Sequence, residues 1–234
     1  MKFSIVIPAR NEAAHIGRCL ESIAAASVRY AGQVEVIVVI NRCTDDTEAI
    51  ALRHGTVIAC DDSRNLSRIR NAGARVATGD ILMTIDADSW MSANMIETID
   101  RKLSTGRFIG GGVPIYTERV SVGIFLTAML ILSMLPGLSA GLFWCYRKDF
   151  NAIGGFDETV VVGEDVDFAK RLRAYGQKMH KRFGTAWGAK ITTSCRKFDR
   201  FGDWFVLRHP LMLWRAVRGQ DSGFGDRLFY DFER

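Results

Sequence analysis

Two common uses of cysteine are missing from this sequence. Its five cysteines are widely spread, and no two of them form a Cys-x-x-Cys pair. Neither a disulfide framework nor a zinc ribbon is therefore indicated, and a reducing environment is expected. No internal repeat or low-complexity segment stands out either. The apolar stretch in the opening "MKFSIVIPARNE" is too short for the core of a signal peptide, so we expect a cytoplasmic protein.

The charge balance is mildly basic. The 234 residues include 31 Lys and Arg against 26 Asp and Glu, a net charge of +5, and 48% of the chain is hydrophobic. These values predict a globular protein with one sizeable core and an anionic partner, such as a phosphorylated ligand or a membrane surface. Nucleic acid is not expected, because the basic residues are scattered among acidic ones and form no stripe.

Strand-like and helix-like stretches alternate four times along the first 103 residues. Compact β-branched runs predict the strands, and apolar residues at helical spacing predict the helices. The predicted strands are 2–8, 34–40, 56–60 and 80–88, and the predicted helices are 11–27, 43–55, 65–79 and 92–103. This alternation indicates βαβ units, and hence an α/β fold whose mostly parallel sheet is flanked by helices.

The ends of the predicted strands carry the polar residues of interest. Open α/β sheets bind ligands at the carboxyl ends of their strands, and "DAD" at 86–88 follows the fourth strand directly. Asp86 and Asp88 supply hard oxygen ligands of the kind that Mg²⁺ or Mn²⁺ prefers. On the tripeptide alone the simpler interpretation is a helix cap at Asp88, with Ser89 and Ser92 as competing caps.

Longer segments resemble one family. Five segments and their order resemble those of the family-two glycosyltransferases with the GT-A fold. In chain order they are "SIVIPARNE", "VEVIVVINRCTDDT", "RIRNAGARVATGDILMTIDADS", "FNAIGGFDE" and "GEDVDFAKRLRAYG". The resemblance extends from residue 4 to residue 176. It implies transfer of a sugar from a nucleoside diphosphate sugar to an acceptor hydroxyl, with inversion and with Mn²⁺ or Mg²⁺ as cofactor.

The resemblance also implies roles for individual residues. Asp88 would hold the metal on the diphosphate, and Asp86 the ribose or a metal-bound water. Asp165 would be the general base, with Glu164 raising the apparent pKa of the pair. The same segment also fits a well-capped amphipathic helix, and both interpretations can hold together. The residues expected to bind the nucleotide sugar are Pro8, Arg10, Glu12, Asn41, Arg70, Asp86 and Arg196.

Two departures from the family pattern leave details open. Ile40 and Asn41 stand where relatives usually have an Asp that contacts the base, so UDP is less strongly implied and GDP or another donor stays open. The family's additional histidine ligand is missing from "AWGAKITTSCRKF". Arg196 and Lys197 in that segment are expected to bring positive charge to the phosphates, or else to form a solvated basic turn.

Residues 120–146 carry no charge, yet a membrane span is not predicted. Pro136-Gly137 divides the run into a helix, 121–135, and the strand-like "GLFWCYR". A span would also place Asp88 and Asp165 on opposite sides of the membrane. We therefore expect the helix to lie on the surface of the acceptor region.

The C-terminal segment 198–234 is amphipathic. It interleaves aromatic residues, among them Trp204, Phe205 and Trp214, with arginines, as interfacial membrane segments do. A peripheral location on the inner face of a membrane, with a lipid-linked acceptor, is the sharper interpretation. Packing on the core or in a homodimer interface is the alternative.

The expected organisation is one GT-A-like domain, 1–197, with an apolar C-terminal extension, 198–234. Within the domain, 1–105 would form the nucleotide-sugar half and 106–197 the acceptor half. A sugar nucleotidyltransferase is one alternative, although it usually needs a glycine-rich basic loop and "PARNEAAH" offers only Arg10. A non-catalytic module that binds nucleotide sugar or membrane is the other, and the presence of Asp86, Asp88 and Asp165 counts against it.

Overall fold

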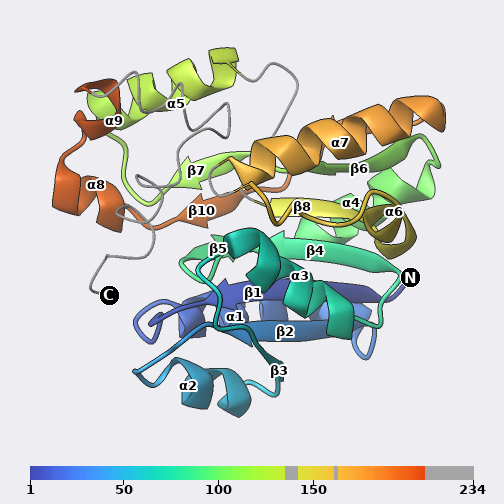
Figure 1. Cartoon of the computed structure of the whole chain (residues 1–234), viewed down its shortest axis with the longest axis horizontal. Coiled ribbons are helices and arrows are strands. Elements are labelled where there is room, and N and C mark those ends of the chain that lie inside the picture. The colour runs from blue at the N-terminus through green and yellow to red at the C-terminus, as the bar shows by residue number, and fades with distance from the viewer. Residues whose placement is uncertain (135–141, 161–162, 209–234) are drawn as a thin grey trace.

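A seven-stranded sheet forms the centre of the computed structural model, which describes residues 1–134, 142–160 and 163–208 (Figure 1). Across the sheet the order is β3 (Val57–Cys60), β2 (Val34–Ile40), β1 (Phe3–Ala9), β4 (Ile81–Ile85), β8 (Leu142–Tyr146), β6 (Phe108–Gly112) and β9 (Arg182–Thr185). β1 to β4 run parallel, β8 is antiparallel to β4 and β6, and β9 is parallel to β6. The expected mostly parallel α/β sheet is thereby confirmed.

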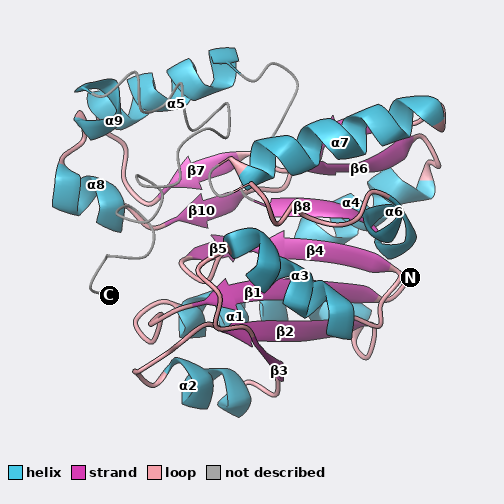
Figure 2. Ribbon diagram, viewed as in Figure 1, coloured by secondary structure: helices cyan, strands magenta, loops and turns pink. Residues whose placement is uncertain are grey.

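Helices cover both faces of this sheet (Figure 2). Side chains of α1 (Ile16–Ser27), α2 (Thr47–Arg53) and α4 (Met95–Ser104) belong to one buried cluster with the sheet. Those of α3 (Leu66–Val76), α6 (Arg147–Ala152) and α7 (Glu164–Lys178) belong to a second cluster. A single 3₁₀ turn, η1 (Val28–Tyr30), follows α1.

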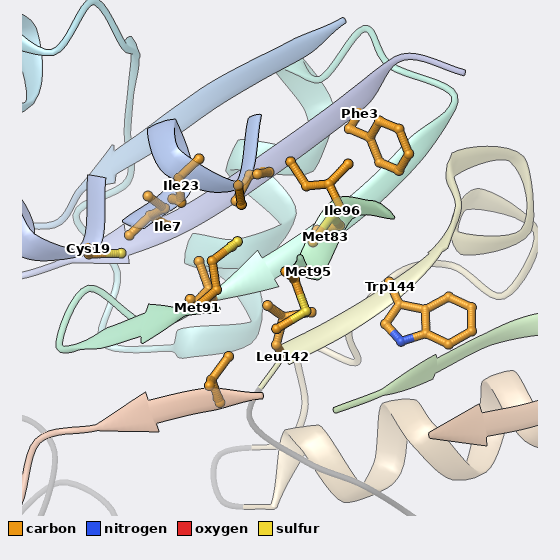
Figure 3. Close-up of a cluster of buried hydrophobic side chains, with 14 of the residues drawn as sticks. Phe3, Ile7, Cys19, Ile23, Met83, Met91, Met95, Ile96, Leu142 and Trp144 are labelled. Atoms are coloured by element: carbon orange, nitrogen blue, oxygen red, sulfur yellow. The ribbon is translucent and has the colours of Figure 1, made fainter. Parts of the chain in front are cut away.

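The two clusters arise from alternation along each central strand. In β1, Ile5 and Ile7 join the α1 side and Val6 joins the α3 side. In β8, Trp144 lies on the first side, where Figure 3 shows it with Phe3, Met83 and Leu142, and Phe143 lies on the second. Because successive strand residues point to opposite faces, a strand covered on both faces must be apolar throughout. Each such fully buried side chain contributes about 1.5–3 kcal/mol.

Gly73 brings α3 close to the sheet. A Cβ atom at this position would lie 2.4 Å from Cγ1 of Val6 and 2.8 Å from Cγ2 of Val39, so no larger residue fits. Arg70 lies one turn earlier on the same side of α3, so it also packs toward the sheet, and its side chain is only 4% exposed.

A second, three-stranded sheet joins distant parts of the chain at one end of the molecule. Its strands are β5 (Ser89–Met91), β10 (Ile191–Thr193) and β7 (Ile115–Thr117), and α5 (Val122–Met134), α8 (Arg196–Phe201) and α9 (Phe205–Arg208) gather beside it (Figure 1). β5 pairs antiparallel with β10, which places Thr193 opposite Ser89. The residues after β10 thereby reach Asp88.

The structure corrects the capping alternative. β4 ends at Ile85, and α4 begins at Met95 with Asn94 as its N-cap residue, so neither Asp88, Ser89 nor Ser92 caps that helix. Asp88 lies in the turn between β4 and β5 instead.

The predicted surface helix and the strand after it are present as α5 and β8. No helix among the described residues combines the length and the apolarity that crossing a bilayer requires. Of the aromatic residues predicted to be interfacial, Trp204 is 45% exposed, and Trp214 lies outside the described residues.

Candidate active site

The carboxyl ends of β1, β2 and β4 meet at one edge of the sheet. The N–H of Asn41 donates to the carbonyl oxygen of Ala9 at 2.9 Å, which joins the first two ends. The side chain of Asn41 is 1% exposed, and its Nδ2 donates to the carbonyl oxygens of Asp61 and Ser63 at 2.5 and 2.9 Å. The Asn41 amide therefore shapes the loop after β3, with both of its N–H groups already used.

Asp86 and Asp88 follow β4 and have different surroundings. The side chain of Asp86 is 44% exposed, and its Oδ1 lies 3.1 Å from Nη2 of Arg70. Asp88 is 14% exposed, and its Oδ2 accepts a hydrogen bond from Ser194 Oγ at 3.1 Å and lies 2.8 Å from Nη2 of Arg196. Each carboxylate thus has an arginine as its partner.

Arg196 also binds Glu12. Its Nη1 and Nη2 donate to Oε2 and Oε1 of Glu12 at 2.7 and 2.8 Å, a bidentate pair, and Glu12 is only 2% exposed. Burial alone would lower the pKa of Arg196, but the hydrogen bonds to Glu12 and the charge of Asp88 raise it above its ordinary value. The guanidinium stays charged and compensates both carboxylates. We call Glu12, Asp88 and Arg196 the Arg196 centre.

Arg70 forms a second such centre. Its Nη1 lies 2.7 Å from Oδ1 of Asp165 and 3.0 Å from Oε1 of Glu164, and its Nη2 contacts Asp86. Burial opposes the charge of Arg70, but Asp165, Asp86 and Glu164 together raise its pKa. We call Arg70 and these three carboxylates the Arg70 centre.

The local chain geometry places Glu164 and Asp165 at the start of α7. Gly163, with φ +78°, is the N-cap residue in the left-handed region that glycine adopts most readily. Burial raises the pKa of Asp165 to about 7; Arg70 opposes this rise, and the charges of Glu164 and Asp86 add to it. A carboxyl group whose pKa lies near neutrality is suited to general base catalysis.

The segment before α7 is held on α3. Asn71 donates from Nδ2 to the carbonyl oxygen of Phe156 at 2.9 Å and accepts from the N–H of Phe156 at 3.0 Å. The Phe156 ring stacks on Phe168 of α7 at 4.4 Å between centroids. Asp157, another carboxylate in this segment, already accepts two hydrogen bonds from Thr159, which lower its pKa and make it less suited to act as a base.

The structure brings most of the predicted site residues together. Glu12, Asp86, Asp88, Glu164, Asp165 and Arg196 lie in the two arginine centres. Pro8 lies in β1, beyond Val6, the last residue of that strand paired with β4, and Arg10 follows the strand. The spacing of the sequence motifs did not indicate Ser194, whose hydroxyl reaches Asp88 only through the pairing of β10 with β5.

The residues after β4 fit a divalent metal. No group of three or more His, Cys, Asp or Glu side chains is poised around a metal position within the described part of the chain. Asp86 and Asp88, two positions apart after β4, still supply carboxylate oxygens at the strand end. Such oxygens suit Mg²⁺ or Mn²⁺, which take their remaining ligands from water and phosphate.

The sheet order and the Asp-x-Asp segment after β4 define a class, the GT-A glycosyltransferases. Staphylococcus aureus TarS 1–349 matches 99% of this chain and 70% of its own at 17% identity, with a TM-score of 0.67. The mannosyltransferase PcManGT from Pyrobaculum calidifontis, solved with GDP-Man and Mn²⁺, matches 98% of this chain and 79% of its own at 18% identity, with a TM-score of 0.65. These likenesses establish the fold.

The family follows from the sequence. The model of glycosyl transferase family 2 matches residues 4–155, and the chain belongs to that family. An uncharacterized glycosyltransferase of Mycobacterium tuberculosis H37Rv is 30% identical over 103 residues, which are 44% of each chain. Glycosyltransferase GlyA of Streptococcus pneumoniae is 24% identical over 107 residues, 44% of this chain and 15% of its own. The matches thus span less than half the length of these relatives.

Proposed function

We propose that this protein transfers a sugar from a nucleoside diphosphate sugar to an acceptor hydroxyl, with inversion at the anomeric carbon. The observation that carries the proposal is the position of Asp165 in the first turn of α7, where its Oδ1 lies 2.7 Å from Nη1 of Arg70 and burial raises its pKa to about 7. Arg70 contacts both Asp165 and Asp86, so the base and one donor-side carboxylate share the same cation. Family 2 membership supports the same activity.

The donor half of the site is assigned to residues 1–105, which Arg196 reaches from the acceptor half, 106–197. Asp86 and Asp88 would hold Mn²⁺ or Mg²⁺, which supplies positive charge to the leaving diphosphate. Pro8, Arg10 and Asn41 would border the nucleotide, because they lie at the ends of β1 and β2. Asn41 has both amide N–H groups engaged, so base recognition falls to other groups around it.

Asp165 would accept the proton of the acceptor hydroxyl as that oxygen attacks the anomeric carbon. The bond from the anomeric carbon to the diphosphate oxygen breaks as the new glycosidic bond forms, and the electron pair leaves with the diphosphate. One direct displacement inverts the configuration. Glu164 would shape the local field through its shared contact with Arg70.

A lipid surface would present the acceptor. On α5, Val122, Phe125, Leu126 and Met129 are 43–67% exposed, whereas Ile124 and Thr127 are buried. The exposed Trp204 precedes α9, which packs against α5. Aromatic and aliphatic side chains on one exposed face, in a protein of charge +5, fit an anionic membrane surface.

The test is a thermal-shift screen of UDP-, GDP-, CMP- and dTDP-sugars with and without Mn²⁺. A ligand at one hundred times its dissociation constant stabilises by about 2.7 kcal/mol. We expect one nucleotide to shift the melting temperature in the presence of Mn²⁺. Asp88→Ala should abolish the Mn²⁺-dependent part of the shift, and Glu21→Gln, an exposed change on α1, should not.

Transfer is then measured with the donor identified by the screen. Release of nucleoside diphosphate with acceptor glycosylation supports the proposal. Synthesis of the nucleotide sugar from a sugar 1-phosphate and a nucleoside triphosphate would instead identify a sugar nucleotidyltransferase. No shift with any nucleotide sugar, with or without metal, would contradict the donor assignment.

A further inference from the structure

One nitrogen atom lies between two carboxylates on the donor side of the site. Nη2 of Arg196 is 2.8 Å from Oε1 of Glu12 and 2.8 Å from Oδ2 of Asp88. Glu12 and Arg196 are separated by 184 residues in the chain, so the fold itself builds this contact. The guanidinium provides positive charge beside Asp88.

A divalent ion and this guanidinium compete for the same carboxylate. A metal ion coordinates carboxylate oxygens at about 2.0–2.6 Å, and it would repel a guanidinium nitrogen already 2.8 Å from the same Oδ2 atom. Displacing Arg196 without a substitute would also break its bidentate pair with Glu12, which is 2% exposed, and breaking a buried ion pair is costly. Without a nucleotide, metal binding is therefore opposed both by the charge of Arg196 and by the loss of its pairing with Glu12.

A diphosphate changes this balance. Its oxygens accept the two parallel N–H bonds of an arginine as a carboxylate does, and they supply ligands to the metal at the same time. Arg196 is 24% exposed and is the first residue of α8, so its side chain faces solvent in part and can reorient about the helix start.

We propose that Arg196 is the counter-ion of Asp88 until the nucleotide binds. Arg196 then pairs with the donor diphosphate instead and leaves Asp88 free for the metal. This inference rests on the proposed function, which assigns Asp88 to the metal. It makes the protein a poor binder of divalent ions until a nucleoside diphosphate is present. Arg196 then contributes to nucleotide affinity even without metal.

The test measures Mn²⁺ binding in the absence of nucleotide. The electron paramagnetic resonance signal of free Mn²⁺ is the readout. Arg196→Gln removes the competing charge and leaves Glu12 and Asp88 facing the same space, so we expect about 10- to 100-fold tighter Mn²⁺ binding than in wild type. The same variant should bind nucleoside diphosphate more weakly than wild type in metal-free buffer. Arg29→Gln, which removes an exposed arginine paired with Glu97, is the control and should match wild type in both measurements.

Equal Mn²⁺ affinity of Arg196→Gln and wild type would overturn the inference. If Arg196→Gln does not fold, Arg196→Lys takes its place, because lysine keeps the charge but cannot form the bidentate pair that arginine makes with Glu12. If Arg196→Lys binds Mn²⁺ more tightly than wild type, by up to about tenfold, the inference is supported. If it binds Mn²⁺ with wild-type affinity, the inference is overturned. Wild type that binds no nucleoside diphosphate even with Mn²⁺ contradicts the proposed function instead, so the two failures are distinguishable.

Discussion

The two arginine centres have the same architecture and differ in how deeply the arginine side chain is buried. Each joins a carboxylate that follows β4 to a segment from the second half of the chain. Arg70 is 4% exposed and contacts three carboxylates, whereas Arg196 is 24% exposed and contacts two. We propose that the buried Arg70 holds the base in place, and that the more exposed Arg196 can exchange its carboxylate partners for a ligand.

Burial also decides what each arginine contributes to stability. Removing one partner of a buried ion pair costs about 3–5 kcal/mol, because the remaining charge is left uncompensated. An exposed pair contributes about 0–1 kcal/mol. The comparison therefore predicts that replacing Arg70 lowers the free energy of unfolding strongly, and that replacing a surface arginine, even on the same helix, lowers it little.

The largest expected effect is on the base. Asp165→Asn preserves the shape of the side chain but cannot take a proton at neutral pH, so transfer should fall by a factor of about 10² to 10⁴. Donor affinity, measured in the same preparation, should be nearly unchanged. Glu164→Gln should cost less, and Asp157→Asn should leave the rate at the wild-type level.

Two results would contradict the role of Asp165 as the base. A loss of donor affinity that accounts for the lost rate would make Asp165 a binding residue. Wild-type rates in both Asp165→Asn and Glu164→Gln would remove the base from α7 altogether.

The next effect is on stability. Arg70→Met leaves the carboxylates of Glu164, Asp165 and Asp86 without their shared cation, so the free energy of unfolding should fall by about 3–5 kcal/mol. Urea denaturation followed by circular dichroism measures the difference. Arg68→Met is the matched control on α3, since Arg68 is 57% exposed and pairs with Glu158 at the surface. A similar loss in both variants would show that burial does not distinguish them.

A third effect is on pH dependence. With the pKa of Asp165 at about 7, kcat/KM should rise about tenfold per pH unit below 7 and level off above it, and Arg70→Lys should move the midpoint. The folded-state pKa lies above the unfolded value of about 3.9. The folded state therefore holds this proton more tightly, and the resulting stability is present below about pH 4 and lost as the pH rises through 7. A rate profile without a midpoint between pH 6 and 8 would exclude Asp165 as the titrating group.

The smallest expected effect concerns the apolar surface of α5. Replacing Phe125, Leu126 and Trp204 by serine should reduce co-sedimentation with anionic liposomes several-fold and leave the melting temperature within a few degrees, because all three side chains are 43–56% exposed. Leu52→Ser, an exposed change on α2 far from α5, is the control (Figure 1). Wild type that forms a dimer and never binds liposomes would assign this surface to a second copy of the chain.

The sequence predicts the sheet better than the contacts of its site. Continuous apolar strands and helical periodicity depend on local chemistry, so β1, β2 and β8 could be located within a residue or two. Asp86, Asp88 and Asp165 could be found from motifs, since acidic residues at strand and helix ends form local patterns.

Arg70, Arg196 and Glu12 could also be named as site residues, but the pairing of the arginines with these carboxylates could not be predicted. Arg70 is one of several arginines in its segment, and its burial depends on the close approach of α3 that Gly73 permits. Arg196 reaches Glu12 only because β10 pairs with β5, a contact between residues about one hundred positions apart for which the local sequence carries no signal. The surface face of α5 was equally hidden, because the helix is apolar all round and only the fold decides which side is covered.

The small sheet of β5, β10 and β7 has a consequence for how the protein matures on the ribosome. Ser194 is 106 residues from Asp88, so at about 5–20 residues per second the carboxylate leaves the ribosome seconds before its partners are made. The strands β1 to β4 have by then been synthesised and are able to pair. Because β10 is the last strand along the described part of the chain, the contacts of Asp88 with Ser194 and Arg196 form after the main sheet is able to pair, and a nascent chain that stops short of β10 presents Asp88 without the arginine that neutralises it.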